Sequence, residues 1–333
     1  MDLTSFWVVG GAGLVLGGIV GAVAQITNFC SVGAVADIVL AGDWRRARSW
    51  LMALAVALLG TQVLSALGIA DLSSTPYGLP ATRWAWVAAS SIAFGYGMAL
   101  AGGCVQRALV RAGAGSIKSL VTLLIIAVAA GITVVMIPNP SEAGVTLPTR
   151  FAFALAGPVA IILVAFCLKD RWFRQSPGHL WGGVAIGAVV AIAWVFSAGH
   201  EFNLGLNLLL DLGVTAIAAP SGFSDVIPLF GLCAIAGIAV GSGAVAAARG
   251  DLSFDRFVDG ADVERHIVGG LLMGIGGAMA YGCTFGQGLT GFTTLSASPV
   301  IAVLGMIGGC VWGIRALEAG TPWGGLRLVF RPR

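Results

Sequence analysis

The chain has 333 residues; 58% are hydrophobic, only 10% are charged, and the mean hydropathy is +0.95. Soluble domains carry about 25% charged residues, so this composition excludes an ordinary soluble enzyme, a disordered chain, a secreted disulfide scaffold and a nucleic-acid-binding protein. Glycine occurs 50 times, which is unusually often. The composition predicts an all-α polytopic membrane protein whose helices pack closely through small residues.

The apolar runs predict about nine transmembrane helices. The first cation in the chain is Arg45, so the first run lacks the basic start of a signal peptide and is expected to remain as a helix. A hydrocarbon core about 30 Å thick requires about 20 apolar residues per helix. The runs that approach this length are 6–25, 50–70, 85–103, 119–137, 151–168, 181–198, 228–248, 266–282 and 299–315.

The loop charges predict the orientation of these helices. If the amino terminus lies outside, 16 of the 18 Lys and Arg residues fall in cytoplasmic loops, and only Arg83 and Arg150 lie outside. Lys and Arg accumulate in cytoplasmic loops of membrane proteins. We therefore expect a multi-pass protein of the bacterial inner (cell) membrane, with a periplasmic amino terminus and a cytoplasmic carboxy terminus.

Three further apolar segments are too long or too broken for simple loops, namely 26–40, 204–224 and 283–298. Non-helical backbone at membrane depth is tolerated only where protein or a water-filled cavity satisfies its hydrogen bonds. We interpret these segments as re-entrant half-helices. The alternative is that they lie along the membrane surface as interfacial segments.

An internal repeat relates the two halves of the chain. The segments 95–104 (GYGMALAGGC) and 274–283 (GIGGAMAYGC) are identical at six of ten positions, with an offset of 179. The same offset relates the other spans, which predicts a single transmembrane transporter domain, 1–333, with repeats over about 1–140 and 180–318 and a linker helix over about 151–168. The loop charges make the two copies inverted, as in secondary transporters. Chance similarity between glycine-rich helices is the alternative.

Three of the six cysteines are flanked by broken Gly, Ser or Asn segments, and these are Cys30, Cys104 and Cys283. At the repeat offset Cys30 corresponds to Leu209, so three thiols, and not four, are expected on a central substrate path. The remaining cysteines, Cys167, Cys233 and Cys310, are interpreted as packing residues. The polar and small neighbours expected beside the path are Asn28, Gln106, Gln287, Gly103 and Gly282; helix-to-helix hydrogen bonding is the alternative role for the polar three.

Thiols offer weak donors and polarizable sulfur, which suits an anion with a soft sulfur end. No cation adjoins Cys30 or Cys283 in the sequence, so we expect neutral thiols that donate hydrogen bonds instead of covalent carriers. Asp37 is the single candidate for an intramembrane acid, and its interpretation as a helix cap near the interface is preferred. No metal-binding spacing occurs, and neither a metal nor a cofactor is expected.

The contexts of the three cysteines, with Thr27-Asn28-Phe29-Cys30 and the two repeat motifs in a nine-span chain, resemble the YeeE/YedE family of sulfur-compound transporters. The resemblance covers nearly the whole chain. It implies an hourglass-shaped, inverted-repeat transporter for thiosulfate, with the ion handled by Cys30, Cys104 and Cys283. It also implies a possible separate cytoplasmic sulfur-carrier protein of the TusA type as a partner.

The leading hypothesis is therefore uptake of thiosulfate across the bacterial inner membrane by a transporter that is not an enzyme. A second hypothesis is a transporter of the same build for another sulfur or selenium compound. A third is a membrane sulfurtransferase or thiol redox protein, in which the cysteines form persulfides or disulfides. Such an enzyme needs a cation that stabilises a thiolate, and Arg107 near Cys104 is the only such pair in the sequence.

Overall fold

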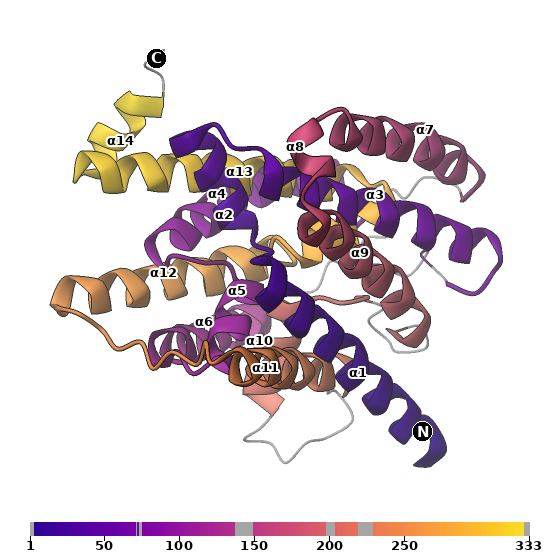
Figure 1. The fold of residues 1–333 in the computed structure, drawn as a ribbon, viewed down its shortest axis with the longest axis horizontal. Helices are drawn as coiled ribbons and strands as arrows, with labels where there is room; N and C mark the ends of the chain where they lie inside the picture. Colours follow the sequence, from indigo (N-terminus) through magenta and orange to yellow (C-terminus); the bar gives the residue numbers. More distant parts are fainter. Residues whose placement is uncertain are drawn as a thin grey trace.

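The computed structural model describes residues 3–70, 72, 75–136, 149–197, 204–218 and 229–329, and these residues form helices and no strand (Figure 1). Each of the nine predicted runs coincides with one long helix, which confirms the all-α class. The long helices are α1 (Leu3–Thr27), α3 (Arg45–Ala66), α4 (Trp84–Leu100), α6 (Ile117–Met136), α7 (Thr149–Leu168), α9 (Pro177–Ser197), α11 (Leu229–Arg249), α12 (Gly260–Met279) and α13 (Ala297–Ala319).

Eight of these helices are long and apolar enough to cross a membrane, judged over the described residues. Helix α12 is the exception, because Asp262, Glu264 and Arg265 fall within its first two turns. From Ile267 onward its sequence is apolar up to the end of the helix. The charged turns are therefore expected at the water boundary, with the apolar remainder in the bilayer.

Shorter elements interrupt or connect the long helices. They are α2 (Ser31–Ala36), the π-turn η1 (Asp37–Ala41), the 3₁₀ turn η2 (Ala81–Arg83), α5 (Val105–Gly113), α8 (Arg171–Arg174), α10 (Leu208–Ala218), the turns η3 (Gly286–Thr290) and η4 (Gly291–Thr294), and α14 (Pro322–Val329). The first and second expected half-helices correspond to α2 with η1 and to α10. The break expected at 220–222 lies outside the described residues.

The segment 283–298, expected as a half-helix, contains a short, distorted helix in which the backbone N–H groups of Gln287, Gly288 and Leu289 donate to carbonyl oxygens four positions earlier. This stretch forms a π-turn followed by a 3₁₀ turn, and an α-helix begins only at Ala297. Gly286, Gly288 and Gly291 give the segment little preference for a regular helix. The segment is nevertheless buried. Irregular backbone is thus enclosed by protein, as it must be at membrane depth.

The long helices pair in a pattern that repeats itself. Helix α1 packs mainly against α11 and α9, and α3 packs against α9 and α7. Helix α4 packs against α13 and α12, and α6 packs against α12 and α10. Exchanging α1 with α9, α3 with α11, α4 with α12 and α6 with α13 leaves the main pairs α1–α11, α3–α9, α4–α13 and α6–α12 unchanged. The chain therefore consists of two repeats with equivalent packing.

Close backbone approach explains the high glycine content. A Cβ atom on Gly17 of α1 would lie 2.1 Å from the carbonyl oxygen of Ala234 on α11. A Cβ atom on Gly309 of α13 would lie 2.0 Å from the carbonyl oxygen of Ile92 on α4. Only glycine permits these contacts. In a bilayer the hydrophobic effect does not drive helices together, so close van der Waals packing of this kind drives their association.

Helix α7 lies at the periphery of the bundle, where it packs on α3 and the short α8 (Figure 1). Its side chains Ile161 and Ile162 are 68% and 66% exposed, which suits contact with lipid tails. Figure 1 also shows the start of α1 and helix α14 at opposite corners of the molecule.

Candidate functional site

The chain reverses direction between α1 and α2, and this turn positions Cys30. Asn28 adopts a left-handed conformation with φ of 53°, which ends α1 and redirects the backbone. Cys30 then caps α2, and its Sγ atom accepts the backbone N–H of Gly33 at 3.3 Å. Because the sulfur acts as an acceptor in this cap, the S–H proton remains free to be donated elsewhere.

The segments of the three predicted cysteines meet in space. The Ser31 Oγ atom lies 2.9 Å from Thr284 Oγ1, although these residues are 253 positions apart in the chain. The Cys104 thiol lies within hydrogen-bonding reach of the side chains of Cys30, Ser31 and Thr284. Cys283 directly precedes Thr284. We call these five residues the thiol cluster.

The thiol cluster is shielded from solvent. Cys30 is 8% exposed, Cys104 is 1% exposed and Cys283 is 0% exposed. Cys104 directly precedes α5, after a break in which Gly102 has a φ of 65°. Broken backbone therefore carries each thiol inward, and the five residues offer thiol and hydroxyl groups.

Arg107 adds a positive charge beside the cluster. Its Nη2 atom donates to Asn28 Oδ1 at 3.1 Å, and the guanidinium lies close enough to Cys30 and Cys104 to interact electrostatically with both. The expectation that Cys30 has no cation near it is therefore wrong. The first turn of α5 places Arg107 beside the end of α1. Arg107 and Asn28 are 79 positions apart in the chain, so the sequence alone does not predict this contact.

The second repeat places Asn207 where the first repeat has Asn28, at the offset of 179. Asn207 immediately precedes α10, and its Oδ1 atom accepts the backbone N–H of Leu210 at 3.4 Å. Asn207 thus caps α10 through the backbone N–H three positions later, as Cys30 caps α2. At the offset of 179, Cys30 still corresponds to Leu209 and Asn207 corresponds to Asn28. Asn207 is the single asparagine in the apolar run 204–212, and this is the sequence signal that could have identified it as a site residue.

Asn207 is fully buried and holds the segment that leads to Cys283. Its Nδ2 atom donates to Tyr77 Oη and to the carbonyl oxygen of Tyr281, both at 3.0 Å. Tyr77 in turn donates to the carbonyl oxygen of Leu204 at 2.8 Å. Tyr281 and Gly282 both have positive φ, 58° and 153°. Buried hydrogen bonds therefore stabilise the strained backbone immediately before Cys283.

The remaining predicted neighbours occupy different settings. Gln287 is fully buried, and its Nε2 atom donates to the carbonyl oxygen of Ala280 at 2.5 Å. Its Oε1 atom has no partner among the described residues, and neither has Nε2 of the buried Gln106. Gly103 and Gly282 are buried in the two breaks. The bond made by Gln287 joins η3 to the residue that ends α12, as the alternative of helix-to-helix hydrogen bonding describes.

The other three cysteines lie inside long helices. Cys167 of α7 donates its thiol to the carbonyl oxygen of Arg48 at 3.3 Å. Cys310 of α13 is fully buried, and its backbone nitrogen would lie 2.8 Å from a Cβ atom on Gly95 of α4. Cys233 of α11 faces Gly10 and Gly13 of α1. These positions agree with packing roles.

The buried acid of the bundle was not predicted from the sequence. Asp37 pairs with Arg46 at 3.1 Å, and both side chains are partly exposed. Asp211 of α10 is the buried carboxyl, at 2% exposure, and its Oδ2 atom has no partner among the described residues. Gly231 of α11 leaves the space that this carboxyl fills. Among the described residues, no group of three His, Cys, Asp or Glu side chains is arranged to hold a metal ion.

Comparisons with known proteins agree with this architecture. A family described as sulphur transport matches the chain twice, over residues 26–168 and 160–312. The thiosulfate transporter TsuA of Escherichia coli is 27% identical over 90% of this chain and 92% of its own length. The thiosulfate transporter TsuA of Spirochaeta thermophila is 26% identical over 87% of this chain and 93% of its own length. These matches confirm the resemblance, and the chain belongs to the YeeE/YedE family of sulphur transport proteins.

Proposed function

We propose that this protein takes up thiosulfate across the bacterial inner membrane along a path lined by Cys30, Cys104 and Cys283. The observation that carries the proposal is the convergence of three broken segments, joined by the bond between Ser31 and Thr284 at 2.9 Å. The relatives named thiosulfate transporter, similar over about nine-tenths of the chain, support the choice of substrate.

The chemistry of the thiol cluster suits this dianion. Thiosulfate presents one polarizable sulfur and three oxygens, and its transfer out of water requires compensating donors. Cys30 keeps its S–H proton for donation because its sulfur accepts from Gly33. Ser31 and Thr284 supply hydroxyl donors, and Arg107 supplies charge at one end. Neutral donors bind the ion weakly enough to release it, which conduction requires.

The proposal includes the orientation and the symmetry. The amino terminus is periplasmic, the carboxy terminus is cytoplasmic, and the repeats over about 1–140 and 180–318 are inverted around α7. Ion pairs join loops that the charge count assigns to the cytoplasm, namely Lys118 with Asp262 at 2.6 Å and Arg48 with Asp170. A separate sulfur carrier of the TusA type would receive the substrate at this face.

The test is uptake of radiolabelled thiosulfate by cells that lack other routes for thiosulfate and sulfate. Cells that produce the protein should accumulate label and grow on thiosulfate as sulfur source, and Cys104→Ala should abolish both. Cys310→Ala is the matched control and should behave as wild type at equal membrane abundance. Uptake that is absent in wild type, or competed by selenite or sulfite but not by unlabelled thiosulfate, would assign another substrate.

A membrane sulfurtransferase is the second candidate, because Arg107 lies near both Cys30 and Cys104. Its step would be attack of a cysteine thiolate on the outer sulfur of thiosulfate, which forms a cysteine persulfide and releases sulfite. Mass spectrometry of protein exposed to thiosulfate decides between the two. Transport by hydrogen bonding predicts unmodified cysteines, whereas a stoichiometric gain of one sulfur atom on Cys30 or Cys104 would support the enzyme.

A further inference from the structure

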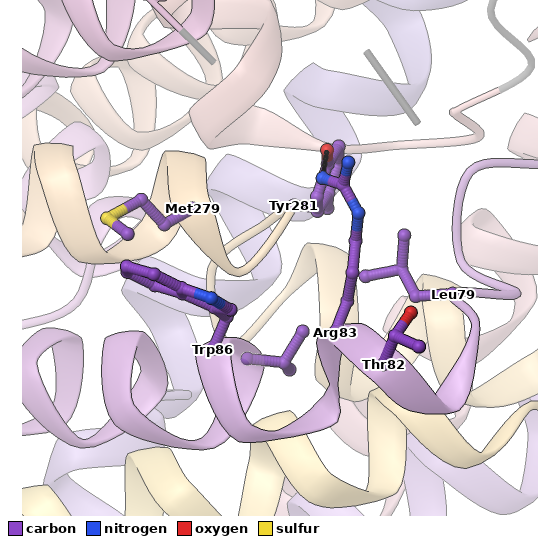
Figure 2. A pocket seen from close by; sticks show the side chains of 7 residues that line it. Leu79, Thr82, Arg83, Trp86, Met279 and Tyr281 are labelled. Atoms are coloured by element: carbon purple, nitrogen blue, oxygen red, sulfur yellow. Dashed lines mark hydrogen bonds between the residues drawn. The ribbon is translucent and has the colours of Figure 1, made fainter. Parts of the chain in front are cut away.

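A cavity lies between the beginning of α4 and the end of α12 (Figure 2). It measures about 370 Å³. Its lining contains one charged residue, Arg83, and no carboxylate; the residues are Leu79, Thr82, Arg83, Trp86, Val87, Met279 and Tyr281. The charge count assigns this end of α4 to the periplasm.

The guanidinium of Arg83 is held by a neutral group. Its Nη1 atom donates to Tyr281 Oη at 3.4 Å, and Figure 2 shows the side chain reaching across the cavity to this ring. Within the described residues Arg83 forms no ion pair, in contrast to Arg45, Arg48 and Arg315, which pair with carboxylates. The positive charge of Arg83 is therefore not offset by a described carboxylate.

Further donors surround this charge. Arg83 directly precedes α4, no side chain caps that helix, and the positive end of the helix dipole lies at the cavity. Thr82 and Tyr281 contribute hydroxyl groups, and the rings of Trp86 and Tyr281 form apolar walls (Figure 2). A single guanidinium with hydroxyl donors and no carboxylate in the lining matches the chemistry of an oxyanion.

The cavity is also adjacent to the thiol cluster along the chain. Tyr281 lies two residues before Cys283, so their Cα atoms are at most about 7 Å apart. The carbonyl oxygen of Tyr281 is fixed by Asn207 at 3.0 Å, which keeps the ring beside Arg83. The residue that holds Arg83, Tyr281, is therefore linked to Cys283 by a short stretch of backbone.

We infer that the cavity around Arg83 and Tyr281 is an outer capture site for a doubly charged sulfur oxyanion. The inference rests on the proposed function, since it supplies that path with its first binding position. Arg83 attracts the ion and holds it loosely, and the thiol cluster then receives it. Binding at such a position raises the local concentration of substrate without participating in passage itself.

The test measures radiolabelled thiosulfate uptake against concentration in phosphatidylcholine vesicles, whose uncharged surface removes competition from anionic lipid headgroups. Arg83→Gln should raise the half-saturating concentration by about tenfold, the range of one charge-assisted hydrogen bond, and leave the maximal rate within about twofold. Arg83→Lys should recover part of the loss. The control Arg256→Gln removes an equal charge from an exposed loop at the other end and should change neither parameter.

Calorimetric titration of the purified protein with thiosulfate separates this inference from the proposed function. Arg83→Gln should weaken binding about tenfold even if wild-type vesicles transport nothing. The absence of transport would contradict only the transport proposal and not the capture site. Unchanged affinity and unchanged half-saturation in Arg83→Gln would overturn the capture site. A substitution that lowers the maximal rate and leaves half-saturation as in wild type would overturn it as well. A defect of Arg83→Gln that appears only when phosphatidylglycerol is added would instead assign the cavity to a lipid headgroup.

Discussion

The break after α1 and the break before α10 stand at corresponding points of the two repeats, but their side chains differ in charge and exposure. At the first break, Asn28 is exposed and accepts from Arg107, and Cys30 caps the short helix. At the second break, Asn207 caps the helix and is fully buried under Tyr77. The break after α1 is thus exposed and charged, and the break before α10 is buried and capped by a neutral amide.

The difference can be traced to single positions. Arg107 corresponds to Gly286 at the repeat offset of 179. A Cβ atom on Gly286 would lie 2.6 Å from Asn207 Oδ1, so a side chain there is incompatible with the buried asparagine. The comparison shows how two repeats of similar backbone come to differ in charge. Gly286 leaves room for the side chain of Asn207 at one break, whereas Arg107 takes the corresponding position at the other.

The largest expected effect comes from removing a feature that the two repeats share. Cys104 and Cys283 are equivalent thiols, so Cys104→Ala and Cys283→Ala should each abolish thiosulfate uptake. Serine at either position keeps a donor but loses soft sulfur, and it should retain part of the rate. Uptake assays at matched membrane abundance check this, with Cys233→Ala as control. Serine variants as inactive as alanine variants would argue for covalent chemistry.

The next effect separates the buried asparagine from the exposed one. Asn207→Ala strips hydrogen bonds from Tyr77, the carbonyl of Tyr281 and the N–H of Leu210, and each buried group left alone costs about 1–3 kcal/mol. Asn28→Ala removes an exposed bond and should cost less than about 0.5 kcal/mol. Thermal unfolding in detergent should therefore show a clear fall in Tm only for Asn207→Ala. Equal Tm values would contradict the asymmetry.

A smaller effect concerns the arginine at the exposed break. Arg107→Gln removes the charge beside Cys30 and Cys104 but keeps a donor for Asn28. We expect a reduced maximal rate of uptake with half-saturation changed by less than about threefold, since Arg107 lies beyond the thiols from the proposed capture site. Arg107→Lys should restore part of the rate. A pattern in which Arg107→Gln changes half-saturation alone would place the first ion contact at this break.

The smallest effect lies where the two repeats are joined by an ion pair. Lys118 Nζ lies 2.6 Å from Asp262 Oδ2 and lowers the pKa of that carboxyl below its ordinary value of 3.8; the backbone N–H of Val258 and nearby His266 act in the same direction. The folded carboxyl therefore binds its proton less readily than the unfolded one, so its stabilisation is present above about pH 4 and lost as the pH falls through the folded pKa.

The measurement compares the Tm of wild type and Asp262→Asn across this range. The two values should differ slightly at about pH 7, because ion pairs that remain in contact with water contribute little, and converge below about pH 4. Lys118→Gln should reproduce the behaviour of Asp262→Asn. A difference that persists unchanged at low pH would show that packing, and not the ion pair, accounts for it.

The sequence alone determined the class of the protein, the long helices and the identity of the three motif cysteines. Apolar runs of membrane-spanning length are local properties of the chain, so they can be recognised without knowledge of contacts. The repeat could be recognised for the same reason, because GYGMALAGGC and GIGGAMAYGC are alike in the letters themselves.

The tertiary structure alone decided which residues share a site. Cys30 and Asn207 each cap a short helix although they are not related by the repeat offset, and only the backbone geometry shows this. Arg107 reaches Asn28 only because α5 starts beside the end of α1. The cavity at Arg83 requires the end of α12 to lie against the beginning of α4. Contacts between distant segments arise from helix packing, whose geometry is a property of the whole bundle and not of any local pattern.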